Sequence, residues 1–363
     1  MQLTREELHR RIWTFGRPGE WPIAHHVQFH ADGSIGGFWD TEEVSWTIAD
    51  GRLVLLDRAD QHAVVFDDLR SGAEGRLAWA GRARNAGEGS SERVLMEIEP
   101  FGALCPPPSD LEIRTREGRR RRNLLVLPAG EASLHPTWPR DVSDEERNWD
   151  LCVSFYGKPE NFGHDDFAEH QVLQPGARKF EALYRLFHEQ SPFWDYDFIA
   201  FPDDDLMLGW RDWNTLFAAC RRFGLDLAQP SITGYPNQPI VHPNPDYFLR
   251  YVSWVEIMTP IFSNRALRLC APTLAASMSG YGLDHVWAKL LGEPENRIAI
   301  IDAVSAVHTR PGNTGTSTYN YEVALREGFE IQRRYGAPWR TVEFGGVRRK
   351  PRVRPPAGHP EES

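Results

Sequence analysis

Three consecutive carboxylates, Asp203-Asp204-Asp205, end a short apolar run that begins at Phe198. An apolar run bounded by turn residues is typical of a buried strand. Adjacent like charges raise each other's pKa unless a cation or several hydrogen-bond donors lie among them. Carboxylate oxygens suit Mg²⁺ or Mn²⁺, which usually share their coordination sphere with substrate phosphates. The triplet therefore indicates either a metal site or, more simply, an acidic cap for the following helix.

A fourth carboxylate, Glu256, interrupts an apolar stretch from Tyr251 to Phe262 that we expect to be extended. Burying an unpaired carboxylate costs several kcal/mol, so a residue in this position needs either a partner or a function. We interpret Glu256 as a candidate for acceptor binding or catalysis. The alternative is an outward position on a strand, facing water.

Two further candidates stand at the ends of predicted elements. Asp284 follows a glycine-loosened turn, Ser279 to Leu283, and opens a helix that continues to Leu291. It either caps that helix or serves as a general base. His308 stands just past an apolar strand from Arg297 to Val307, at the strand's carboxyl edge, where ligands gather in an open α/β sheet.

The elements that must position these side chains alternate between strands and helices in residues 121–315. Such alternation predicts a mostly parallel, Rossmann-like sheet flanked by crossover helices. Because the carboxyl ends of parallel strands meet at one edge, we expect the acids and His308 to face the same crevice. The predicted strands are Asn123–Pro128, Trp149–Gly157, a strand ending at Asp203, Leu227–Ile232 and Arg297–Val307, and the predicted helices include Lys179–Glu189, Trp210–Phe223 and Arg265–Ala276.

Residues 1–103 have a different pattern, in which short β-like runs are separated by Gly and Asp turns. Regular short strands with frequent turns predict a small all-β barrel or sandwich domain. Trp39, Trp46 and Trp79 form either a glycan-stacking surface or part of the core of this unit. We expect this domain to bind glycan or to position an acceptor.

Segments rich in Pro and Arg flank the predicted α/β domain. Residues 104–120 predict a stiff linker, and residues 316–363 predict a helix followed by a basic, proline-rich tail. The tail, Val347 to Arg354, is either a solvated end or a peripheral contact with anionic lipid. The run Arg119 to Arg122 either grips a diphosphate or forms a solvated edge before the next strand.

The composition excludes several classes of protein. The 363-residue chain carries 51 acidic and 41 basic side chains, the opposite of the balance found in proteins that wrap nucleic acid. Its four cysteines are scattered without zinc-like spacing, which favours free thiols in a reducing compartment. The first residues lack the apolar core of a signal peptide, and no segment is long and apolar enough to span a bilayer. We therefore expect a cytoplasmic protein.

In chain order, Asp203-Asp204-Asp205, Gly282-Leu283-Asp284 and Val307-His308 resemble the motifs of GT-A glycosyltransferases. Within that superfamily, the stretch from Arg121 to Pro311 resembles an uncharacterised family, the domain of unknown function 707. The residues that carry this second resemblance are Asn123 to Gly130, Ser133-Leu134-His135, Ser154-Phe155-Tyr156-Gly157, Phe201 to Leu206, Trp254-Val255-Glu256-Ile257-Met258 and Gly282-Leu283-Asp284.

The resemblance implies a metal-dependent transfer of a sugar from a nucleotide-diphosphate sugar to a hydroxyl acceptor. Asp203, Asp205 and His308 would hold Mn²⁺ or Mg²⁺ against the diphosphate, where the ion acts as a Lewis acid. Asp204 would meet ribose or sugar hydroxyls. Asp284 would take a proton from the acceptor, which would invert the anomeric carbon.

The remaining assignments complete the predicted site. We place Gly157, at the end of a strand, and Lys179, at the start of a helix, with Asp204 among the residues that bind the donor. Glu256 joins Asp284 as a catalytic candidate. GT-A enzymes usually have an acid just before this Asp, but here the residue is Leu283. If Asp284 only orients the donor, retention is the alternative outcome.

Two other functions fit the sequence less well than transfer does. A sugar nucleotidyltransferase usually has a Gly-rich phosphate loop followed by a basic residue, and Pro128-Ala129-Gly130-Glu131 is a poor version of that loop. A glycan-binding protein with an inactive transferase-like domain would not require Asp203, Asp205 and His308 together. We therefore predict a glycosyltransferase that contributes to polysaccharide or glycoconjugate synthesis.

Overall fold

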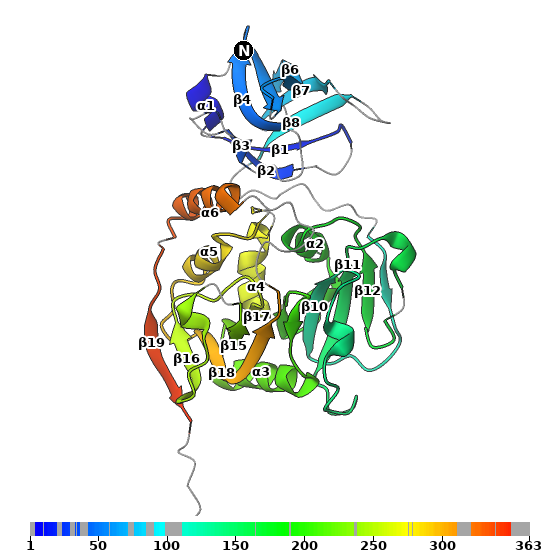
Figure 1. Cartoon of the computed structure of the whole chain (residues 1–363), viewed down its shortest axis with the longest axis vertical. Helices are drawn as coiled ribbons and strands as arrows, with labels where there is room; N and C mark the ends of the chain where they lie inside the picture. Colours follow the sequence, from blue (N-terminus) through cyan, green and yellow to red (C-terminus); the bar gives the residue numbers. More distant parts are fainter. Residues whose placement is uncertain are drawn as a thin grey trace, which may run out of the picture.

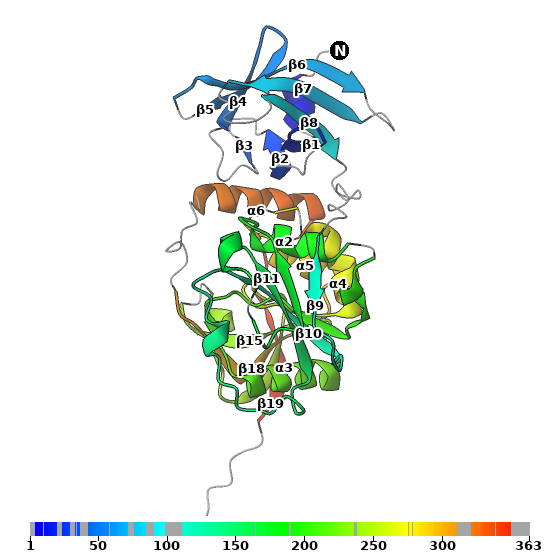
Figure 2. The ribbon, with the colours of Figure 1, turned by 90° about the vertical axis from the view of Figure 1, so that its right-hand side faces the viewer.

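The chain forms two sheets, which Figures 1 and 2 show in separate parts of the molecule. The structure is a computed structural model. It describes residues 4–9, 11–19, 24–29, 33, 35–36, 43–57, 59–71, 76–84, 91–98, 111–163, 165–188, 190–235, 238–274, 276–277, 279–310, 321–337 and 339–349. The smaller sheet is built from residues 12–98 and the larger one from residues 113–348.

The smaller sheet has eight antiparallel strands in the order β3-β2-β1-β8-β7-β6-β5-β4, after a short helix, α1 (Arg5–His9). Trp46 N in β4 donates a hydrogen bond of 2.8 Å to Gly33 O, just before β3, so the two edges of the sheet approach each other. The sheet therefore curls toward a barrel. Its strands are β1 (Ile12–Gly16), β2 (Ala24–Phe29), β3 (Ile35–Gly36), β4 (Glu43–Ala49), β5 (Arg52–Asp57), β6 (His62–Ser71), β7 (Leu77–Ala83) and β8 (Glu92–Ile98).

Large aromatic side chains fill the interior of this sheet. Trp13, Phe29 and Phe66 are fully buried, and Trp46 and Trp79 are only 2% and 3% exposed. A glycan-stacking surface requires exposed ring faces, so that interpretation is wrong for Trp46 and Trp79. Trp39 lies outside the described residues.

The larger sheet is mixed rather than mostly parallel, which corrects the prediction. One parallel block is β12-β11-β10-β13 and another is β15-β18, and the short strand β17 joins them by pairing antiparallel with both β13 and β15. The order is β19-β16-β18-β15-β17-β13-β10-β11-β12-β9, with β14 paired to β18. The strands are β9 (Ile113–Thr115), β10 (Asn123–Ala129), β11 (Trp149–Phe155), β12 (His170–Leu173), β13 (Phe198–Ala200), β14 (Leu206–Met207), β15 (Leu227–Gly234), β16 (Tyr247–Val252), β17 (Ile261–Ser263), β18 (Ile298–His308) and β19 (Glu343–Arg348).

Both faces of the larger sheet are buried, so its central strands are almost wholly apolar. Along β10, Leu124 and Val126 contribute to one core, and Leu125 and Leu127 contribute to the other. Helix α3 covers the second face; α2, α4, α5 and α6 lie on the first, with α6 next to α5 (Figures 1 and 2). The helices are α2 (Lys179–Leu186), α3 (Trp210–Phe223), α4 (Asn264–Cys270), α5 (Leu283–Leu290) and α6 (Tyr321–Tyr335).

The predicted extended stretch from Tyr251 to Phe262 is wrong. Strand β16 ends at Val252 and β17 begins at Ile261, so a connecting segment, residues 253–260, carries Glu256. Ser253 Oγ donates to Arg340 O and accepts from Val342 N, both at 2.9 Å, before the chain turns away from β16. Glu256 therefore occupies neither face of a strand.

The basic and linker segments are more ordered than we expected. Within the predicted linker 104–120, β9 pairs with β12, and residues 104–110 lie outside the described part. Arg120, Arg121 and Arg122 form ion pairs with acidic side chains at the amino-terminal end of β10, so they are not available to grip a diphosphate. The basic tail begins inside β19, which pairs with β16.

In the described part of the chain, no helix has the length and apolar character needed to cross a membrane. Cys152, Cys220 and Cys270 are buried free thiols, as the sequence predicted, and Cys105 lies outside the described residues.

Gly234 occupies a position of the larger sheet that only glycine fits. Its φ is +88°, and a Cβ there would lie 2.2 Å from His308 O, its neighbour in the parallel pair β15–β18. We expect Gly234→Ala to lower the free energy of unfolding by about 3 kcal/mol through backbone strain and this clash. Gly224→Ala is the control, because Gly224 has a φ of +59° but open space around it. It should cost about 1 kcal/mol. Equal losses in urea unfolding would contradict the clash.

Candidate active site

The pairing of β14 with β18 brings the acidic triplet to His308. Leu206 lies opposite His308 in this short antiparallel ladder, so Asp205 reaches the imidazole across about a hundred residues of chain. Asp205 Oδ2 lies 3.2 Å from His308 Nε2. Thr309 N and Thr309 Oγ1 both donate to Asp205 O, at 3.1 and 2.8 Å, which fixes the backbone of the acid.

The other nitrogen of His308 is already committed. His308 Nδ1 lies 3.0 Å from Tyr235 O, and a backbone carbonyl can only accept, so Nδ1 carries a proton. This leaves Nε2 facing Asp205. The pKa of His308 is raised: burial acts to lower it, but the hydrogen bonds to Asp205 and to Tyr235 O outweigh burial. A histidine that ligates a metal is commonly oriented in this way by a carbonyl behind it.

Asp205 has one oxygen to spare. Its Oδ1 is buried and has no hydrogen-bond partner within the part of the chain that the structure describes. A buried carboxylate oxygen without a donor is costly, and a cation would satisfy it.

Asp203 is held by Lys179, the predicted donor-binding lysine at the start of α2. Lys179 Nζ donates to Asp203 Oδ1 at 2.5 Å and to the carbonyls of Ile257 and Met258 at 2.7 and 3.0 Å. Burial lowers the pKa of Lys179, and the charge of Asp203 opposes that effect. All three ammonium protons are therefore engaged, and Lys179 orients Asp203 instead of facing a donor directly.

Asp204 and Gly157 also have neighbours within the protein. Asp204 Oδ2 accepts from Gly130 N at 3.1 Å and from Tyr156 Oη at 2.8 Å, which ties the ends of β10 and β11 together. A Cβ on Gly157 would lie 2.6 Å from the carboxylate of Glu131. The geometry thus gives Asp204 and Gly157 structural contacts at the edge where donor binding was predicted.

Glu256 and Asp284 form a second, acidic part of the same site. Glu256 is 6% exposed, and its backbone N–H donates to Gln229 Oε1 at 2.5 Å. Burial, followed by the charge of Asp284, raises the pKa of Glu256 to about 8, and Asp203 and His308 also act on it. Burial raises the pKa of Asp284, in the first turn of α5, to about 7. Two carboxyl groups that titrate near neutrality are suited to proton transfer.

Arg310 is a residue that the sequence analysis missed. Its guanidinium lies 3.7 Å from Asp204 Oδ1 and donates to Ala132 O, so it sits at the same mouth. A cationic side chain two residues after a strand-end histidine is a signal that could have drawn attention to it. Arg310 supplies positive charge beside the carboxylates.

The donor set can be tested against a divalent ion. The oxygens of Asp205 and Asp203 and Nε2 of His308 are the ligand types that Mn²⁺ accepts. In the described ranges, however, no group of three or more His, Cys, Asp or Glu side chains is already arranged to hold a metal. The fit rests on the unpartnered oxygen of Asp205 and the orientation of His308, while Asp203 is shared with Lys179.

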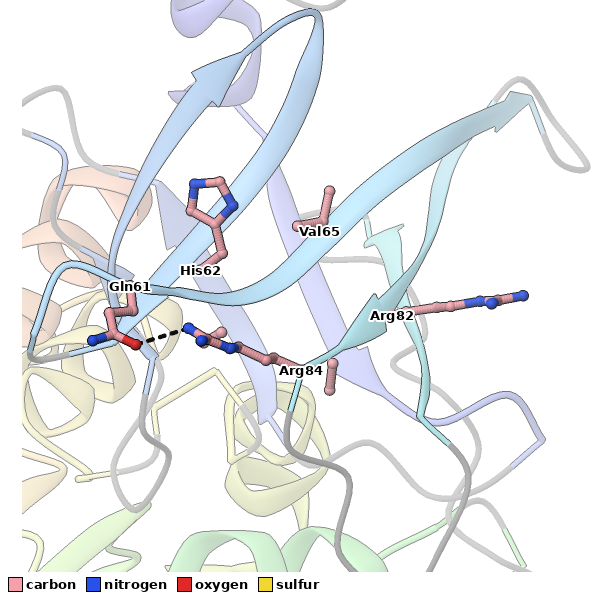
Figure 3. Close-up of a pocket in the computed structure, with 7 residues that line it drawn as sticks. Gln61, His62, Val65, Arg82 and Arg84 are labelled. Carbon is pink, nitrogen blue, oxygen red and sulfur yellow. Dashed lines mark hydrogen bonds between the residues drawn. The ribbon is translucent and has the colours of Figure 1, made fainter.

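A separate hollow of about 710 Å³ lies on the smaller sheet, over β6 and β7. Arg84 Nη1 donates to Gln61 Oε1 at 2.7 Å, whereas Arg82 extends away from that pair, as Figure 3 shows. Its polar groups do not converge on one point. We therefore place the candidate active site at the acidic mouth of the larger sheet.

No protein-family model and no curated protein matches the chain. Its structural neighbours include S. aureus TarS and GalNAc-T7. S. aureus TarS 1–349 in complex with UDP-GlcNAc is 13% identical, with a TM-score of 0.39, over 59% of this chain and 65% of that one. GalNAc-T7 with UDP, GalNAc and Mn²⁺ is 7% identical, with a TM-score of 0.44, over 59% of this chain and 49% of that one.

A third neighbour is much shorter. A psychrophilic marine protease MP inhibitor is 16% identical, with a TM-score of 0.20, over 27% of this chain and 100% of that one. The chain spans less than two thirds of the TarS 1–349 and GalNAc-T7 structures. Similarity at this level carries no assignment of residues.

The buried Glu256 should give stability a characteristic pH dependence. Because its folded pKa of about 8 lies above its ordinary value of 4.5, the protonated form is favoured by folding. Its contribution is fully present below the ordinary value and is lost as pH rises to about 8, at up to about 1.4 kcal/mol per pH unit.

We therefore expect Glu256→Gln to remove this fall, so that the variant gains stability relative to wild type between pH 5 and 8. Urea unfolding across that range measures the effect. Glu160→Gln, at an exposed carboxylate, is the matched control. Parallel pH curves for wild type and Glu256→Gln would contradict the buried carboxyl.

Proposed function

We propose that this chain is a metal-dependent glycosyltransferase of the GT-A type, and that it moves a sugar from a nucleoside diphosphate sugar to a hydroxyl acceptor. The observation that carries the proposal is the contact between Asp205 Oδ2 and Nε2 of His308, an imidazole of fixed orientation. In the part of the chain that the structure describes, the other oxygen of Asp205, Oδ1, is buried and has no hydrogen-bond partner. Packing alone does not require this combination of a carboxylate, an imidazole and a spare oxygen.

Asp205 and His308, with Asp203, would hold Mn²⁺ or Mg²⁺. The ion would supply positive charge to the departing nucleoside diphosphate. Lys179 keeps Asp203 in place without competing for the diphosphate, because its three protons are used within the protein. Arg310, beside Asp204, adds a guanidinium that a diphosphate could meet bidentately.

The acceptor would be activated on the side of the two buried acids. With a pKa of about 7, Asp284 can ionise near neutral pH and take a proton from an acceptor hydroxyl. Glu256, with a pKa of about 8, keeps its proton there and can donate a hydrogen bond to the acceptor. A base on the face opposite the leaving group gives inversion.

The finer assignments remain predictions of the same proposal. They are membership of the family of unknown function 707, the domain boundaries at residues 103, 120 and 315, a glycan-binding role for the smaller sheet, and cytoplasmic residence. The sugar nucleotidyltransferase and the inactive glycan-binding protein are outcomes that the binding experiment below separates.

Isothermal calorimetry with UDP and with GDP, with and without Mn²⁺, tests the metal role. Wild type should bind one nucleotide more tightly with Mn²⁺, and Asp205→Asn should reduce that affinity about 100-fold, since it removes a charged ligand. Asp195→Asn is the control, because Asp195 is exposed and paired with Arg120 at the opposite end of the strands. Equal Mn²⁺-dependent affinity in Asp205→Asn and wild type would show that Asp205 is not a ligand.

Turnover tests the base. Asp284→Asn should reduce nucleoside diphosphate release from the bound donor by about 100-fold or more, because the amide cannot accept the acceptor proton. Its affinity for the nucleotide should stay within about twofold, since Asp284 lies on the acceptor side. A variant that turns over at the wild-type rate would exclude Asp284 as the base.

A further inference from the structure

We propose that Glu327, on α6, is a positioning residue that holds Asp284 at the acceptor side of the site. The inference rests on the proposed function, in which Asp284 is the base. Glu327 is 1% exposed, and its Oε2 accepts hydrogen bonds from Ser279 Oγ at 2.7 Å, from Ser277 Oγ at 3.2 Å and from Ser279 N at 3.3 Å. One buried carboxylate oxygen thus accepts three hydrogen bonds from the segment that leads into α5.

Each serine hydroxyl also accepts a hydrogen bond from a backbone N–H of the same segment. Ser277 Oγ accepts from Gly280 N at 2.8 Å, and Ser279 Oγ accepts from Tyr281 N at 3.1 Å. A hydroxyl that donates to a carboxylate becomes a better acceptor for the next donor. Glu327 therefore organises Ser277 and residues 279–282, and the latter run directly into the first turn of α5.

Close packing reinforces the same geometry. Gly282 has a φ of +85°, and a Cβ there would lie 2.6 Å from Gly328 O, so α6 contacts the loop without any intervening side chain. Gly280, with a φ of +82°, leaves no room for a Cβ against Phe180 and Ile257. Phe180 follows Lys179 in the sequence, and Ile257 follows Glu256. The loop is therefore the point where α2, residues 253–260 and α6 meet.

Asp284 follows this loop by two residues, and its side chain accepts a hydrogen bond from the next backbone amide. His285 N donates to Asp284 Oδ1 at 2.9 Å, and Val286 N donates to Gly282 O at 3.1 Å. A shift of residues 279–282 would move both bonds. Since a displacement of about 1 Å at a reacting group costs up to about 100-fold in rate, holding this loop matters for turnover.

Three variants test the proposal on the full chain. Glu327→Met removes the acceptor at similar size, and Glu327→Gln keeps one acceptor oxygen for the serines. Glu330→Met makes the same change three residues along α6, where the carboxylate pairs with Arg333 and Arg334 on its own helix. Hydrogen exchange of peptides covering residues 277–287, Mn²⁺-dependent UDP affinity and nucleoside diphosphate release from UDP-GlcNAc and a panel of other UDP- and GDP-sugars are measured for each.

We expect Glu327→Met to speed exchange in residues 277–287 about tenfold and to lower the turnover number about tenfold or more, with KM and UDP affinity within about twofold. Glu327→Gln should recover most of both effects, and Glu330→Met should show neither. If Glu327→Met does not fold, Ser279→Ala takes its place with the same expectations.

Unchanged exchange and turnover in Glu327→Met would overturn the proposal. A loss of UDP affinity equal to the loss of turnover would also overturn it, because that pattern indicates a general structural role. The proposed function has a separate failure, in which the wild-type chain binds no nucleoside diphosphate. Even then, the exchange measurement still decides whether Glu327 holds the loop.

Discussion

The antiparallel pairing of Leu206 with His308 is the constraint on which the site depends. This ladder between β14 and β18 is only two residues long, but it holds the acidic triplet before β14 against the end of β18. The three adjacent carboxylates repel one another, and each of them contacts a different set of neighbouring groups. Asp203 has an ammonium, Asp204 has a backbone N–H and a phenol, and Asp205 has an imidazole. Within the described part of the chain, Oδ1 of Asp205 is buried without a hydrogen-bond donor.

The mixed sheet explains how acids from distant segments reach one mouth. Antiparallel β17 lies between the two parallel blocks and begins opposite the end of β13, so the chain before it lies beside the segment that follows β13. Phe201 N donates to Pro260 O and Asp203 N donates to Met258 O, and residues 253–260 present Glu256 to the site and two carbonyls to Lys179. A wholly parallel sheet would have needed a helix at this place and would have left Glu256 elsewhere.

Local patterns predicted much of the larger domain. Helix α3 has the predicted bounds, Trp210–Phe223, because its apolar positions repeat with helical spacing and Gly224 ends it in the left-handed conformation. Strand β10 and the strand-end position of His308 followed from apolar runs and turn residues. The sequence could not reveal β14, Lys179 against Asp203, or β19 beside β16, because each depends on pairing between segments far apart in the chain. Whether Trp46 and Trp79 lie in the core or on the surface was ambiguous for a similar reason. The inner face of a strand can be identified only when the strands that pair with it are known.

The environments of the two buried acids divide their roles. Burial raises the pKa of Asp284 to about 7, although its place in the first turn of a helix and the hydrogen bond from His285 N both favour its charged form. Glu256 lies in a connecting segment under stronger burial and beside the charge of Asp284, and both features favour its neutral form. Near neutral pH the pair therefore holds one proton on Glu256 while Asp284 is able to accept another. Because the charge of Asp284 raises the pKa of Glu256, moving Asp284 would change the acidity of Glu256. The loop that α6 holds through Glu327 thus acts on Glu256 as well as on the position of Asp284.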